Sequence, residues 1–94
     1  MVMDRIIEVI RNLEHGEEIN IGDDAIKIRK VETYRCGFSD VIDFGIMTDY
    51  KEGCIVFGIG VSEKAIMNST FDLEGHIRRK MAEAILQRLK RKKQ

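Results

Sequence analysis

The chain contains no proline and no tryptophan, and its aromatic residues are only two tyrosines and four phenylalanines. Without proline, every turn must be made by Gly, Asn, Asp or Ser. Long apolar runs are also missing: the longest is the eight-residue stretch 54–61, which Gly58 interrupts. A membrane-spanning helix needs about 20 apolar residues, so the sequence predicts no membrane partner.

Cysteine and histidine are scarce, with two residues of each. His15, Cys36, Cys54 and His76 are the metal-ligand types, but none lies within four residues of another, so no metal site is predicted. No basic segment followed by an apolar segment opens the chain, so we expect no secretion signal. Reduced thiols and a cytoplasmic location are the corresponding expectations.

A chain of 94 residues with 44% hydrophobic and 34% charged residues is expected to fold as a single domain, 1–94. A chain of this size buries roughly 65% of the surface that its unfolded form exposes. That burial supplies one core without a disulfide or a metal ion.

Helical spacing of apolar residues predicts two helices. The first spans 4–15, with Asp4 as its N-cap. The second begins near Thr70, with Ser69 or Thr70 as its cap and a frayed basic tail over 89–94. Its apolar stripe consists of Leu73, Ile77, Met81, Ala84, Ile85 and Leu89.

Alternating apolar residues between the helices predict two hairpins. The first pairs a short strand, 19–21, with a longer one that ends near Tyr34 and is bulged near Lys30. The second joins strands around 42–46 and 55–61 through a turn at 50–53. Residues 35–40 read as a loop, and 62–69 as a helical turn.

These elements give the order α-β-β-β-β-α. Because each strand has one clearly apolar face, the sequence predicts a two-layer α+β fold. Its antiparallel sheet has three or four strands, with the N- and C-terminal helices on one face.

The opposite face of the second hairpin is rich in glycine, which weakens a strand unless something approaches its backbone closely. A ligand, a protein partner or a second subunit would explain it, and so would coverage by residues 62–69 of the same chain. If the face is open, a homodimer is the first expectation. This face comprises Asp43, Gly45, Met47, Cys54, Val56, Gly58 and Gly60.

The net charge of zero hides a strong asymmetry. Residues 78–94 carry eight bases and one acid, whereas residues 1–77 carry eight bases and fifteen acids. The basic end fits three interpretations: complementing the helix dipole, binding the phosphates of a nucleic acid, or binding an acidic partner. Its candidate residues are Arg78, Arg79, Arg88, Lys90, Arg91, Lys92 and Lys93.

The order of elements resembles the double-stranded-RNA-binding domain, in which two helices pack on one face of an antiparallel sheet. That family carries a lysine cluster at the start of its second helix. Here residues 70–75 read Thr-Phe-Asp-Leu-Glu-Gly, and the cluster Arg78-Arg79-Lys80 comes later. The resemblance therefore implies a fold without the family's signature.

No catalytic constellation is recognisable. Asp40, Asp43 and Asp49 lie on or beside one strand, but only Asp43 and Asp49 share a face. We therefore predict no enzyme and no cofactor. The sequence favours a small non-catalytic binding or regulatory protein that acts by macromolecular docking and self-association, of the kind that phages and mobile elements encode as accessory proteins or inhibitors. Nucleic-acid binding through the basic helix is the alternative.

Overall fold

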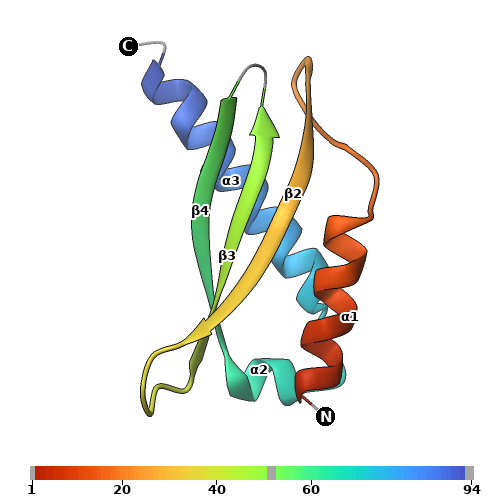
Figure 1. The fold of residues 1–94 in the computed structure, drawn as a ribbon, viewed down its shortest axis with the longest axis vertical. Helices are drawn as coiled ribbons and strands as arrows, with labels where there is room; N and C mark the ends of the chain where they lie inside the picture. Colours follow the sequence, from red (N-terminus) through yellow and green to blue (C-terminus); the bar gives the residue numbers. More distant parts are fainter. Residues whose placement is uncertain (1, 51–52, 93–94) are drawn as a thin grey trace.

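Four antiparallel strands form one curled sheet, with helices at both ends of the chain (Figure 1). The structure is a computed structural model that describes residues 2–50 and 53–92. The predicted α+β order is confirmed, and the segment 62–69 indeed contains a short helix. In chain order the elements are α1 (Val2–Glu14), β1 (Ile19–Ile21), β2 (Asp24–Arg35), β3 (Val41–Tyr50), β4 (Gly53–Ser62), α2 (Glu63–Met67) and α3 (Leu73–Lys92).

The strands lie in sequence order, β1-β2-β3-β4. β1 pairs only with the beginning of β2, from Asp24 to Ile26. The β2–β3 register shifts between Ile28 and Lys30, which confirms the bulge that the broken alternation predicted. The β3–β4 pairing is continuous, and the predicted turn between them falls on residues 51–52, outside the described residues.

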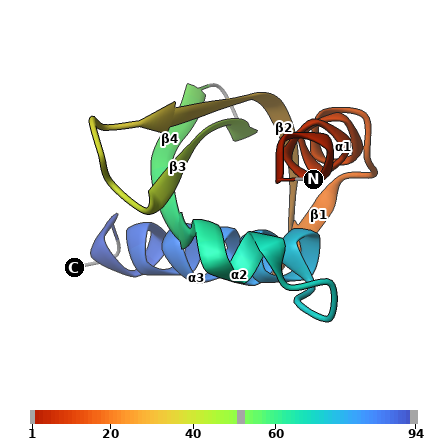
Figure 2. The same cartoon turned by 90° about the horizontal axis from the view of Figure 1, so that it is seen from below.

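The helices cover one face of the sheet. Figure 2 shows α1 beside β2, with α2 and α3 together on the same side of the sheet, in agreement with the contacts between these elements. Phe44 and Ile46 from β3 are fully buried there, in one core cluster with Ile77 and Met81 of the α3 stripe. One polar residue, Thr48, is also fully buried, and its hydroxyl donates to the Ile55 carbonyl at 3.1 Å.

Both long helices differ from their predicted limits. α1 begins at Val2, so Asp4 lies in its first turn and the predicted Asp4 cap is wrong. α3 begins at Leu73, so the predicted Ser69 or Thr70 cap is also wrong. Asp72 is the cap instead, because its Oδ1 accepts the Gly75 amide at 3.0 Å. The Thr70 amide donates to Asn68 Oδ1, also at 3.0 Å. α3 continues to Lys92, past the start of the frayed tail predicted for 89–94.

One arginine ties the N-terminal helix to the connection between α2 and α3. The guanidinium of Arg5 donates to the carbonyl oxygens of Ile66 at 2.5 Å and Asn68 at 2.8 Å, and also to that of Phe71. These contacts fix α2 on the helical side of the sheet. In the part of the chain that the structure describes, no helix has the length and apolar content to span a membrane.

Candidate functional site

The seven residues predicted to share a sheet face do share it. Their cross-strand neighbours place them in rows: Asp43 beside Gly60, Gly45 beside Gly58, and Met47 beside Val56. Cys54 adds a fourth row, opposite Asp49. We call this the outer face, because it is the face that α1, α2 and α3 leave uncovered.

The outer face is open to solvent. Val56 exposes 50% of its surface, and Asp43, Cys54, Gly58 and Gly60 are also exposed. The interpretation that residues 62–69 cover this face is wrong, because α2 contacts β4 and α1 while its Ile66 is buried in the core. The side chains of this surface are therefore available to a partner.

Tyr34 of β2 belongs to the outer face, although the sequence interpretation did not include it. Its ring lies over Gly45, where an added Cβ would come within 2.9 Å of Tyr34 Cε2. The alternation that resumes after the bulge was the signal that placed Tyr34 here. A shallow hollow of about 160 Å³ results, lined by Lys30, Glu32, Tyr34, Gly45, Ile46, Met47 and Val56.

A charged cluster borders this hollow. Glu32 accepts a hydrogen bond from the Tyr34 hydroxyl, and its Oε1 lies 2.6 Å from Lys30 Nζ. The hydrogen bond from Lys30, followed by that from Tyr34, lowers the pKa of Glu32. The hydrogen bond to Glu32 raises the pKa of Tyr34 and also that of Lys30. The cluster thus holds its charges at neutral pH and suits hydrogen bonding more than proton transfer.

The three glycines of the outer face differ in the space that a side chain would find at each position. A Cβ on Gly45 would meet the Tyr34 ring, and a Cβ on Gly60 would lie 3.1 Å from Val41 Cγ1 and 3.2 Å from Asp43 Oδ1. Above Gly58 the space is open, with only the Phe44 carbonyl oxygen at 4.0 Å. Contacts within the chain therefore account for two glycines and leave Gly58 without an internal explanation.

The carboxylates do not assemble a catalytic pair. Asp43 and Asp49 are six residues apart on β3 and hence about 20 Å from each other. Asp49 Oδ1 lies 3.6 Å from Arg29 Nε. Among the described residues no group of three or more His, Cys, Asp or Glu gathers to hold a metal ion.

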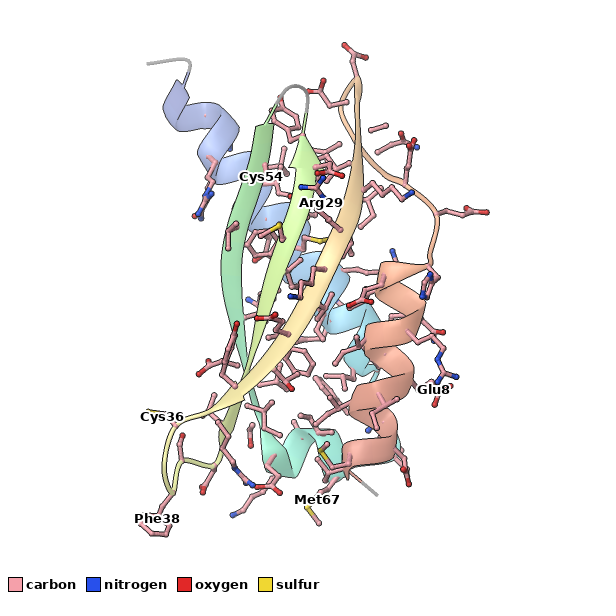
Figure 3. All side chains as sticks on the ribbon, viewed as in Figure 1. Glu8, Arg29, Cys36, Phe38, Cys54 and Met67 are labelled. Atoms are coloured by element: carbon pink, nitrogen blue, oxygen red, sulfur yellow. The ribbon has the colours of Figure 1, made fainter. Side chains whose placement is uncertain are left out.

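The two thiols are also separated. Cys36 lies in the loop between β2 and β3, and Cys54 lies at the start of β4, so they occupy opposite ends of the sheet (Figure 3). Both are exposed free cysteines. A thiol pair acting together at one site is therefore not available in this arrangement.

Three of the described cations of α3 are engaged within the chain. Arg78 pairs with Glu74 at 3.4 Å and Lys80 with Glu83 at 3.5 Å. Arg88 Nη2 donates to the Val56 carbonyl at 2.6 Å. Arg79 and Lys90 are exposed. The side chains of Arg91 and Lys92, and the whole of Lys93, lie outside the described residues.

Comparison with protein-family models, with curated proteins and with solved structures finds no match for this chain.

Proposed function

We propose that this protein is a small non-catalytic binding protein that docks on another macromolecule through the outer face. The observation that carries the proposal is that this face is uncovered while its centre is apolar: Val56 is half exposed and stands beside Met47. An accessory or inhibitor protein acts in this way, by occupying a surface of its target.

The chemistry of the outer face supports a protein partner. β4 carries no charged side chain along its whole length, Gly53–Ser62, and the cores of protein interfaces are likewise depleted in charge. Tyr34 adds an aromatic ring with a polar end, a type enriched where interfaces concentrate their binding energy. Burying the apolar centre contributes about 25 cal/mol per Å², whereas Lys30 and Glu32 provide a polar rim.

The cellular setting is also part of the proposal. Two exposed free thiols suit a reducing compartment, in which disulfides rarely persist. We therefore place the docking protein in the cytoplasm, where it regulates or inhibits its target.

Single acidic substitutions test the outer face. Met47→Asp and Val56→Asp are expected to weaken partner binding at least about tenfold, because a buried unpaired charge is costly. The measurement is quantitative affinity capture at low and high salt. We expect the wild-type interaction to change little with salt, since apolar contacts dominate it.

Ile7→Asp is the matched control, because Ile7 of α1 is 49% exposed against 50% for Val56 and lies off the outer face. It should leave binding intact, and circular dichroism should show all three variants folded. Equal binding by wild type, Met47→Asp and Val56→Asp would refute docking through this face.

Nucleic-acid binding is a second candidate, and one observation favours it. The last turns of α3 run past the edge of the sheet (Figure 1), with Arg88 and Lys90 exposed. Phosphate contacts lose affinity steeply between about 50 and 200 mM salt. Fluorescence anisotropy with duplex RNA and with duplex and single-stranded DNA tests this idea.

The paired substitution Arg88→Glu with Lys90→Glu should abolish such binding if the basic helix carries it. Arg11→Glu, which changes an exposed cation of α1, is the control. Absence of binding by the wild type at low salt would remove this candidate and leave the outer face as the docking surface.

A further inference from the structure

β4 is an edge strand whose outward backbone groups can be identified. The Val56 carbonyl accepts a hydrogen bond from Arg88 of α3, so it points away from β3. In an antiparallel ladder, residues two apart direct their amide and carbonyl groups to the same side. The backbone groups of Gly58 and Gly60 therefore also point outward, away from the sheet.

The two long edges of the sheet differ in how far other groups cover their backbone hydrogen-bonding groups. On β2, the strand β1 pairs with the first residues, the register is bulged, and Glu14 Oε1 accepts the Val31 amide at 3.0 Å. On β4, Arg88 covers Val56, but no hydrogen bond or ion pair among the described residues covers Gly58 or Gly60. β4 also lacks charge, proline and bulge, the features that usually prevent edge pairing.

We infer that β4 is joined by β4 of a second copy of this chain, in antiparallel pairing that makes one sheet of the two. The outward residues are Cys54, Val56, Gly58, Gly60 and Ser62. All of them find partners in one register only, with Gly58 opposite Gly58 on the two-fold axis. Val56 then lies opposite Gly60 of the second copy, and Cys54 opposite Ser62.

Charge complementarity supports a second copy as the occupant. The two-fold axis brings the Cys54 end of β4, close to which Arg88 contacts Val56, beside the Ser62 end of the other β4. That end carries the exposed carboxylates of Asp40 and Asp43, the latter paired across the strands with Gly60, whereas Glu63 is engaged by Arg35 of its own chain. The Gly60 amide of the second copy then replaces Arg88 at the Val56 carbonyl. The released Arg88 guanidinium remains close to the acidic end of the second copy's β4.

Charge-swap variants at the axis test the pairing directly in the full chain. Gly58→Lys and Gly58→Glu have room, since a Cβ there meets nothing closer than 4.0 Å. Each variant sets two like charges against each other and should raise the dimer dissociation constant about fivefold or more. An equimolar mixture should restore association, because the introduced lysine and glutamate face each other. Sedimentation velocity over a concentration series measures this, and Gly58→Ala, which adds no charge, should dimerise like the wild type.

Two results would overturn the inference: a wild type that remains monomeric up to about 200 µM, or folded Gly58→Lys and Gly58→Glu variants that each self-associate as the wild type does. A second measurement needs no substitution. The amide hydrogens of Gly58 and Gly60 should exchange more slowly as protein concentration rises, and exchange that is independent of concentration contradicts strand pairing.

The edge inference does not depend on the proposed function. It concerns backbone hydrogen bonds and self-association, whereas Met47→Asp on the central strand β3 tests the capture of another macromolecule. If one of the two proposals fails its test, the other is unaffected, so the two failures can be distinguished.

Discussion

Glu32 organises the polar side of the outer face. Its carboxylate holds both the Tyr34 hydroxyl and the Lys30 ammonium group. Because the Tyr34 ring lies over Gly45, the position of the cluster also sets the shape of the hollow beside Met47. An ionised Glu32 is thus the residue on which the local geometry depends.

Glu32→Gln is expected to lower the pKa of Tyr34 toward its usual value near 10, because the charged acceptor that stabilises the phenol is removed. Since folding raises this pKa, the Tyr34 contribution to stability is present below the unfolded pKa and is lost as pH rises through the folded pKa. Ultraviolet absorbance of the phenolate measures the titration. Tyr34→Phe identifies which transition belongs to Tyr34 and which to Tyr50. An unchanged titration in Glu32→Gln would contradict the hydrogen bond.

At the scale of elements, Arg5 couples α1 to the α2–α3 connection. It donates to three backbone carbonyls, of which those of Asn68 and Phe71 also accept a backbone amide. A hydrogen bond that involves a charged group contributes about 1.5–3 kcal/mol. The three bonds of Arg5 share one guanidinium that is only partly buried, so we expect about 2 kcal/mol for the whole set. The small helix α2, of five residues, depends on such contacts because it is too short to be stable by itself.

Arg5→Ala should lower the free energy of unfolding by about 2 kcal/mol, measured by urea denaturation. Arg11→Ala on the exposed side of the same helix should change it by less than about 0.5 kcal/mol. Equal effects of the two substitutions would show that the Arg5 contacts add nothing to stability.

The strands were predictable because their apolar alternation is strong, and the break in that alternation after Ile28 revealed the bulge. The cap of α3 could not be predicted from the sequence, because Ser69, Thr70 and Asp72 are all residue types that cap helices well. Which of them caps α3 depends on where the chain leaves α2. The contacts of Arg5, more than sixty residues away in sequence, hold that connection, and local patterns carry no information about such contacts.

Only part of the outer face was predicted from the sequence. Its seven β3 and β4 residues follow from the period of two, which the register bears out. The β2 contribution depends on which side of the bulge each residue falls. The exact position of the bulge, between Ile28 and Lys30, was therefore needed before the alternation could assign Lys30, Glu32 and Tyr34 to the outer face. That Tyr34 fills the space over Gly45 is a packing fact that no spacing encodes.

At the scale of the whole molecule, the chain separates its surfaces. One side of the sheet is filled by the helices, the outer face is left open, and β4 ends the sheet with an uncharged edge (Figure 2). Exposed apolar residues that gather on one open face are a feature of protein interaction sites, and Tyr34 and Val56 are both exposed on this face. Docking through the outer face is therefore the central claim.

Photo-cross-linking in intact cells tests that claim most directly, with a photoreactive amino acid placed at Met47 in one variant and at Ile7 in another. The account predicts a discrete cross-linked product from position 47 and none from position 7. No product from position 47, or the same products from both positions, would contradict docking through the outer face.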